Sequence, residues 1–193
     1  MVSVLAGVVL VALATLIANP ASAQWGQRFT VAAGPAIGID DLPPDIGVHV
    51  RASVAATPRP RTFNVIADGY LTWLAPGTKT FTSPLGSVEF RNKETQIGVG
   101  LSGLVTFARR QPVSPYLLLG GVYRRSDASQ RAVRRDPDGQ VVEEAAAELK
   151  ANDLDILVGL GAAFRWGSRR LLVEARGYGG SVVYLPVTLG LTF

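Results

Sequence analysis

The chain has 193 residues, enough for one domain, and 18% of them are charged. It contains no cysteine, which excludes disulfides, thiolate metal sites and a cysteine nucleophile. The net charge is +4 and the pI is near 9.8, but the positive residues lie in predicted turns and loops and not on one helix face, so nucleic-acid binding is not expected.

An apolar run from Val4 to Ala18 opens the chain, and Asn19-Pro20 follows and would end a helix. Ala21-Ser22-Ala23 then supplies an A-x-A cleavage pattern. The run is shorter than the roughly 20 residues of a spanning helix, and no Lys or Arg precedes it. The pattern predicts a signal peptide at 1–23 and a mature domain at 24–193; a retained membrane anchor is the alternative.

The mature chain alternates between apolar and polar residues with period two, which is typical of half-buried strands. No later stretch reaches 18 uninterrupted apolar residues, so a membrane protein built from helices is excluded. The expected strands are 29–39, 47–55, 62–74, 94–107, 115–124, 153–166, 170–178 and 183–193. The strand at 115–124 is apolar on both faces, so its register stays open.

These predicted strands are long enough to cross a bilayer when tilted, which takes about 9 to 11 residues. The connections at 56–61, 108–114 and 167–169 are short, whereas those at 75–93 and 125–152 are long and fall on one end. Outer-membrane barrels have short periplasmic turns and longer outside loops. The sequence therefore predicts an all-β protein: an eight-stranded antiparallel up-and-down transmembrane β-barrel, closed so that no strand edge meets lipid.

The last strand, Val187-Thr188-Leu189-Gly190-Leu191-Thr192-Phe193, alternates and ends on an aromatic residue. In this, and in the stretch Pro115 to Gly121, the chain resembles the small eight-stranded outer-membrane barrels of the OmpA-like kind. The resemblance implies a bacterial outer-membrane location and lipid contact. It also implies that Phe193 belongs to an assembly signal read by the barrel-insertion machinery.

Four charged residues fall on the polar faces of predicted strands: Arg51, Asp68, Glu174 and Arg176. An unpaired charge in a narrow, dry interior costs several kcal/mol, so we expect these residues to form an ion-pair network that fills the lumen. A gated ion path lined by the same charges is the alternative, although eight strands leave little room for a wide channel. The glycines at Gly98, Gly100, Gly159 and Gly161 are expected to make room in the lumen.

The only histidine is His49, and Ser53 lies on the same strand face roughly 13 Å away at the strand rise. A catalytic serine and histidine must lie within hydrogen-bond distance, so no catalytic residue, cofactor site or metal site is expected. Aromatic residues near strand ends are candidates for membrane-interface girdles: Trp25, Trp73, Trp166, Tyr178 and Tyr184.

The segment 125–152 is the most charged part of the chain. Asp136-Pro137-Asp138-Gly139 predicts a turn, and Glu143 to Lys150 has helical composition, so either an extended hairpin or a short helix is expected there. A charged loop of this kind could bind a partner, but its solvation alone explains the charge.

The leading functional prediction is a monomeric outer-membrane protein with a structural, adhesion or limited-permeability role and no catalytic activity. A soluble, periplasmic, lipocalin-like ligand carrier is the second hypothesis; its apolar strand faces would point inward. A lipid-modifying barrel enzyme is the third.

Overall fold

The computed structural model describes residues 29–38, 46–55, 62–108, 111–180 and 183–193. The predicted signal peptide, Trp25 and the segments 39–45, 56–61, 109–110 and 181–182 lie outside the described residues. No helix long and apolar enough to cross a bilayer occurs among the residues described.

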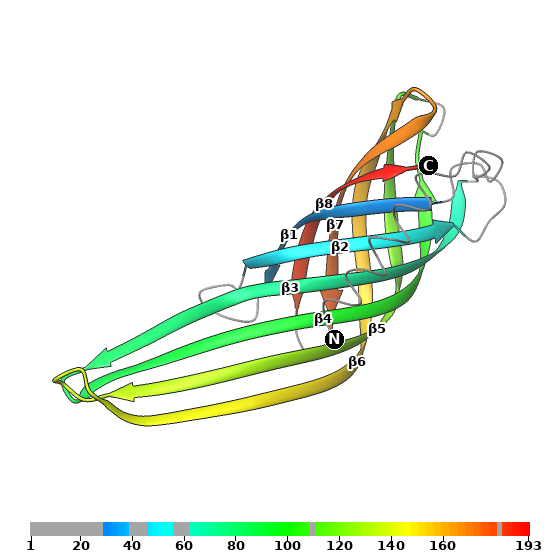
Figure 1. The fold of residues 1–193 in the computed structure, drawn as a ribbon. Coiled ribbons are helices and arrows are strands. Elements are labelled where there is room, and N and C mark those ends of the chain that lie inside the picture. The colour runs from blue at the N-terminus through cyan, green and yellow to red at the C-terminus, as the bar shows by residue number, and fades with distance from the viewer. Residues whose placement is uncertain (1–28, 39–45, 56–61, 109–110, 181–182) are drawn as a thin grey trace.

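The described residues form eight strands that close into an antiparallel barrel, which confirms the predicted fold (Figure 1). The strands are β1 (Phe29–Gly38), β2 (Ile46–Ala55), β3 (Phe63–Ser83), β4 (Gly86–Thr106), β5 (Val113–Arg135), β6 (Val141–Trp166), β7 (Arg169–Gly179) and β8 (Tyr184–Thr192). Each strand pairs with the next along the chain, and β8 pairs with β1 from Thr30↔Thr192 to Gly38↔Tyr184. Because the barrel is closed, each strand of the barrel wall has a hydrogen-bonded neighbour on both sides, as a barrel in lipid requires.

Apolar side chains point out of the barrel and polar side chains point in. Residues on the outer face are exposed: Val99, Leu101, Val158, Leu160, Val187 and Leu189. Residues on the inner face are buried: Gln96, Ser102, Glu174 and Arg176. We call the outer apolar surface the apolar belt. This facing is the one expected for a barrel in lipid and the opposite of what the carrier hypothesis requires.

The structure also fixes the register of β5, which the sequence left open. Tyr116, Leu118 and Val122 are buried in the lumen, whereas Leu117 and Leu119 are exposed on the apolar belt. Both faces of this strand are apolar, because one lies on the exposed apolar belt and the other packs against glycines of neighbouring strands. A Cβ at Gly161, for example, would lie 2.6 Å from the ring of Tyr116, so the expectation that such glycines make room in the lumen is confirmed there.

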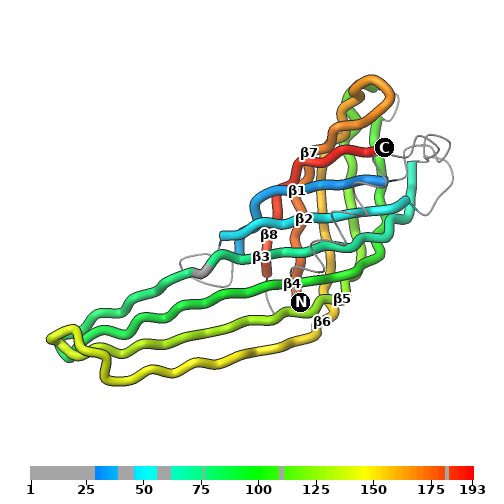
Figure 2. The backbone as a smooth tube through the Cα atoms, in the orientation of Figure 1, coloured from blue at the N-terminus to red at the C-terminus, as the bar shows by residue number. Residues whose placement is uncertain are grey.

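Four neighbouring strands continue far beyond the barrel wall. β3, β4, β5 and β6 are 21, 21, 23 and 26 residues long. The β4–β5 ladder runs without interruption from Ser87↔Arg135 to Thr106↔Tyr116, so two hairpins join into one sheet. This projecting sheet, formed by residues 75–94 and 125–152, extends from the end of the barrel opposite the C-terminus (Figures 1 and 2).

The segments 75–93 and 125–152 lie at one end as expected, but both are paired strands where long connections were predicted. Of the two alternatives for 125–152, the extended hairpin is confirmed and the short helix was wrong. The turn at Asp136–Gly139 is confirmed: the Gly139 amide donates to the Asp136 carbonyl at 3.0 Å, and Gly139 has φ of 82°. Glu143 to Lys150 lies in β6 and not in a helix, because pairing with β5 satisfies its backbone and overrides its local helical propensity.

The projecting sheet has two outer edges. The β2–β3 ladder ends at Leu74 and the β6–β7 ladder begins at Ile156, so beyond these points β3 and β6 each have one neighbouring strand. The edge strand β6 carries charged side chains at Glu143, Glu144, Glu148 and Lys150. Charges on an edge strand oppose unspecific pairing with other chains, which fits a sheet that stands in water.

Candidate functional site

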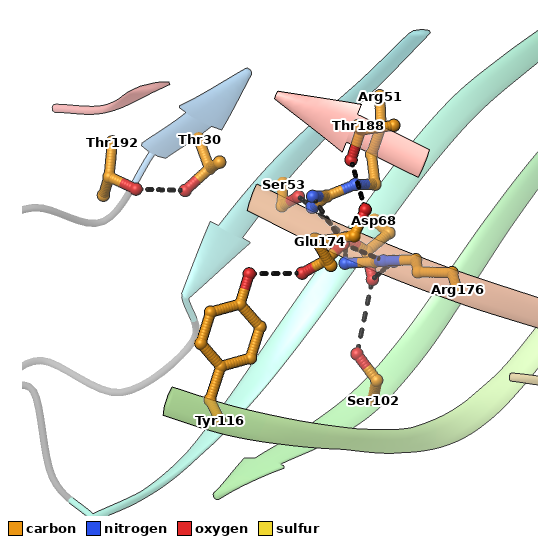
Figure 3. Close-up of polar contacts among 10 residues, drawn as sticks. All are labelled: Thr30, Arg51, Ser53, Asp68, Ser102, Tyr116, Glu174, Arg176, Thr188 and Thr192. Carbon is orange, nitrogen blue, oxygen red and sulfur yellow. Dashed lines mark hydrogen bonds and ion pairs between the residues drawn. The ribbon is translucent and has the colours of Figure 1, made fainter. Parts of the chain in front are cut away.

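The four predicted lumen charges lie together inside the barrel (Figure 3). Arg51 Nη2 lies 2.8 Å from Glu174 Oε1, and Arg51 Nη1 lies 3.3 Å from Asp68 Oδ1. Arg176 Nη1 lies 3.1 Å from Asp68 Oδ2, and its Nε also pairs with Glu174 Oε1. All four side chains are almost fully buried. Two cations and two carboxylates balance, which is the condition for keeping charges in a dry interior.

Strand alternation explains why these residues meet. Glu174 and Arg176 are two residues apart on β7 and therefore point to the same side. In the β2–β3 ladder Asp68 lies opposite Ser53. The next pair on the same face is Arg51 opposite Tyr70, so Arg51 and Asp68 are diagonal neighbours. The barrel then brings β7 and the β2–β3 pair to face each other across the lumen.

Hydroxyl groups complete the network, and the sequence interpretation missed them. The Tyr116 hydroxyl donates to Glu174 Oε2 at 2.8 Å, and the Ser102 hydroxyl donates to Asp68 Oδ2 at 3.3 Å. Arg51 Nη1 donates to the Ser53 hydroxyl. The bonds from Tyr116 and Ser102 give each carboxylate a further hydrogen-bond donor besides the arginines, as buried charges need.

A layer of aromatic rings fills the lumen next to this network. Tyr178 and Tyr184 stack with ring centroids 4.5 Å apart and planes 1° from parallel. Tyr70 and His49 pack beside them, with the Tyr70 centroid 5.1 Å from that of Tyr178. The expectation that Tyr178 and Tyr184 belong to an interface girdle was therefore wrong, whereas Trp73 and Trp166 are exposed on the outer face.

A second polar layer, beyond the aromatic rings, lies nearest the projecting sheet. Arg124 Nε is 2.8 Å from Asp155 Oδ2, and Arg124 Nη2 is 3.3 Å from Asp153 Oδ2. The sequence pattern did not reveal this pair, because the facing of β5 could not be assigned from it. Applying period two from Tyr116 to Arg124 would have placed the arginine inside, level with Asp153 in the β5–β6 ladder.

Among the residues that the structure describes, no serine hydroxyl hydrogen-bonds to His49. His49 is buried, and its Nδ1 lies 2.8 Å from the Thr72 hydroxyl, while Ser53 is bonded to Arg51. Among the described residues no group of His, Cys, Asp and Glu could hold a metal ion.

No protein-family model and no curated protein sequence matches the chain. Among solved structures, the barrel is similar to Neisserial surface protein A, with 14% identity, a TM-score of 0.55, and coverage of 85% of this chain and 95% of that one. This chain has the fold of the small eight-stranded outer-membrane barrels.

Two further outer-membrane barrels match over most of their length. The attachment invasion locus protein Ail of Yersinia pestis is 14% identical, with a TM-score of 0.47 and coverage of 86% of this chain and 97% of that one. The N-terminal β-barrel domain of Pseudomonas aeruginosa OprF is 11% identical, with a TM-score of 0.44 and coverage of 87% and 99%.

In this outer-membrane barrel fold, Phe193 lies directly after β8, at the seam that closes the barrel. Its amide donates to the Phe29 carbonyl at 2.8 Å, and the guanidinium carbon of Arg169 lies 5.1 Å from its ring centroid. Phe193 therefore holds the end of the closing ladder, while its role in assembly stays a prediction.

Deleting Phe193 is expected to lower the amount of folded barrel in the outer membrane and to leave export intact. The reason is that closure must accompany insertion, since an open edge in lipid leaves backbone groups unpaired. Heat-dependent gel migration of membrane fractions measures folded protein. Phe193→Tyr should retain it, and Arg169→Gln separates the ring contact from the aromatic residue itself. An unchanged level of folded protein in the deletion would contradict the assembly role.

Proposed function

We propose that this protein is a monomeric outer-membrane anchor that presents the projecting sheet at the cell surface for attachment to a partner. The observation that carries this proposal is the uninterrupted β4–β5 ladder, which runs from the apolar belt to the hairpin tips. Strands paired over their whole length make a stiff surface, whereas loops of the same length would not.

The apolar belt and the filled lumen support an anchoring role. The belt is a continuous exposed apolar surface, which is costly in water and suited to lipid. Inside, the ion pairs, the aromatic rings and the Arg124–Asp155 pair occupy successive levels. We therefore infer that the lumen stabilises the barrel and does not conduct solutes, and that His49, bonded to Thr72, has no catalytic role.

The position of the projecting sheet supports an outward display. It leaves the barrel at the end opposite the short turns and the C-terminus (Figure 1), and outer-membrane barrels place their long connections outside. The similar Neisserial protein is named a surface protein, which agrees with this orientation.

A shortened variant tests the proposal. Residues 78–91 and 131–146 are each replaced by Asn-Gly, so that Gly77 and Asn92, and Gln130 and Ala147, close the hairpins at existing ladder pairs. We expect the shortened barrel to keep its heat-dependent gel migration, because the belt and lumen are untouched. Attachment of whole cells to a panel of immobilised proteins and polysaccharides should fall to the level of cells that lack the protein.

Two further measurements separate display from conduction. The sequence has no cysteine, so Asp138→Cys at the tip gives one site for a membrane-impermeant maleimide, which should label it on intact cells. Planar bilayers containing the full chain should show no ion conductance. Failure to label the tip, equal attachment by the shortened variant, or steady conductance would each overturn part of the proposal.

A further inference from the structure

The turn of the β3–β4 hairpin lies at the far end of the projecting sheet, and large apolar side chains are exposed there (Figures 1 and 2). Leu85 in the turn is 81% exposed, and Phe81 on the strand before it is 63% exposed. Phe90 is exposed as well, and its ring lies edge-on to that of Phe81 with the centroids 5.9 Å apart. We call these three residues the apolar tip. Exposed apolar clusters of this kind commonly mark interaction sites.

The apolar tip lies in an uncharged part of the hairpin. No charged residue occurs between Lys79 and Glu89, a run of nine residues that contains the whole turn. A charged side chain is expensive to bring into lipid. The end of this hairpin therefore lacks the groups that would oppose its entry into a bilayer.

The backbone of the turn is hydrogen-bonded within the hairpin. Ser83 and Gly86 form the last pair of the β3–β4 ladder. The Leu85 amide donates to the Ser83 hydroxyl oxygen at 3.3 Å, and that hydroxyl donates to the Gly86 carbonyl at 3.3 Å. Pro84, between them, has no N–H group to satisfy. Because backbone groups without a partner are costly in lipid, this turn is suited to leave water.

The β5–β6 hairpin ends beside the apolar tip, since Ser87 pairs with Arg135 in the β4–β5 ladder. Residues 134–140 of this second hairpin contain Arg134, Arg135, Asp136 and Asp138, and two cations with two carboxylates give 2 − 2 = 0. Anionic membranes attract segments that carry a cluster of cations. A neutral tip with charges of both signs fits a zwitterionic surface instead, one that carries choline and phosphate groups.

The apolar tip stands far above the membrane that holds the barrel. Leu85 is twelve residues before Ile97, which is exposed on the apolar belt. At about 3.3 Å per residue the chain covers roughly 40 Å over that distance, or about 28 Å in height at a tilt of about 45°. The polar layer of a leaflet is roughly 5 to 8 Å thick, so any bilayer that the tip meets is a second one.

We propose that the apolar tip inserts into the surface of a second, zwitterionic phospholipid bilayer, that of a membrane to which the cell attaches. Leu85 and Phe81 would enter the boundary between headgroups and acyl chains, where shallow membrane-binding segments place their apolar side chains. The charges of residues 134–140 would stay among the headgroups. A protein partner fits less well, because three apolar side chains on a convex tip are far fewer than the roughly 20 to 30 residues that each side of a stable protein interface contributes.

This inference rests on the proposed outward display and names lipid as the surface that the projecting sheet meets. In the test, cells that display the full chain are mixed with fluorescent phosphatidylcholine vesicles, and flow cytometry measures how many vesicles they capture. Leu85→Asp is expected to lower capture about tenfold or more, because it replaces an inserting apolar side chain with a charge. Leu85→Trp should capture at least as many vesicles as the wild type, since tryptophan favours the membrane interface.

A matched control uses another exposed leucine of the projecting sheet. Leu149 is 52% exposed on β6 and lies away from the turn, so Leu149→Asp should capture vesicles like the wild type. All three variants change exposed side chains, and heat-dependent gel migration verifies their folding.

A second measurement locates the tip relative to the bilayer. The chain has no cysteine, so Leu85→Cys accepts one environment-sensitive dye, in protein held in a lipid nanodisc that covers the apolar belt. Added phosphatidylcholine vesicles should shift the emission of the dye to the blue, and brominated lipid in those vesicles should quench it. The same dye at Asp138→Cys, on the neighbouring hairpin, should stay among the headgroups and respond less.

Equal capture by Leu85→Asp and the wild type would overturn the inference, as would unchanged emission of the dye at Leu85→Cys. Capture that requires an anionic lipid in the vesicles would overturn it too, because charge and not the apolar tip would then carry the binding. Labelling of Asp138→Cys on intact cells tests display separately. Cells that are labelled there but capture no vesicles would contradict this inference alone.

Discussion

Replacing Asp68 with Asn is expected to destabilise the barrel by about 3 kcal/mol, because removing one partner leaves buried charges uncompensated. Asp68 pairs with both Arg51 and Arg176, so the variant would leave two guanidinium groups to share Glu174. Asparagine has nearly the same volume, so the loss reports charge and not packing. Urea unfolding of the protein in phospholipid vesicles, followed by tryptophan fluorescence, measures the change.

A double variant and a surface variant control this experiment. Asp68→Asn combined with Arg176→Gln restores a neutral lumen and should recover part of the lost stability. Glu144→Gln breaks an exposed pair on the projecting sheet and should leave unfolding unchanged. If Asp68→Asn unfolds like the wild type, the four lumen charges do not stabilise the barrel, and the gated-path alternative gains.

Replacing Leu160 with Arg is expected to cost about 2 to 4 kcal/mol, the range for a cation on the lipid face near the bilayer centre. Leu160 lies near the middle of the part of β6 that belongs to the barrel wall, residues 153–166. Its side chain points outward and is 62% exposed. The matched control is Leu149→Arg on the same strand, since Leu149 lies in the projecting sheet and is 52% exposed. The same urea titration measures both.

The control should unfold like the wild type, because its arginine stands in water. A large loss in Leu149→Arg would mean that the projecting sheet is also embedded in lipid. No loss in Leu160→Arg would mean that the apolar belt does not meet lipid, which would contradict a membrane location for the barrel.

The alternation of apolar and polar residues with period two was sufficient to place the strands of the barrel wall, and it assigned the faces of all of them except β5. The rule works because one face of most strands points out of the barrel with apolar side chains and the other points into the lumen with polar ones, so the chemistry changes at every residue. It placed Arg51, Asp68, Glu174 and Arg176 on inward faces, and the structure brings all four together. Where both faces are apolar, as in β5, the rule gave no register and Tyr116 was missed.

The projecting sheet could not be predicted in the same way because both of its faces carry polar side chains. Alternation there carries little information, and the run from Glu143 to Lys150 even favours a helix by composition. Its strand conformation comes from pairing with β5, a long-range contact that local propensity does not contain. Tyr178 and Tyr184 were misplaced for a related reason, since an aromatic residue near a strand end suits the lumen as well as the interface.

The continuity of β4 and β5 from the lumen level to the hairpin tips has a mechanical consequence. A pull applied at the tips runs nearly along the strands, so the hydrogen bonds of the β4–β5 ladder would be loaded together, in shear. A flexible loop joined to the barrel rim would instead pass its load to the first pairs of each strand and open them one after another. A cell held by this sheet against flowing liquid would therefore pull on the whole wall of the barrel, and the ladder from Ser87↔Arg135 to Thr106↔Tyr116 would share the tension.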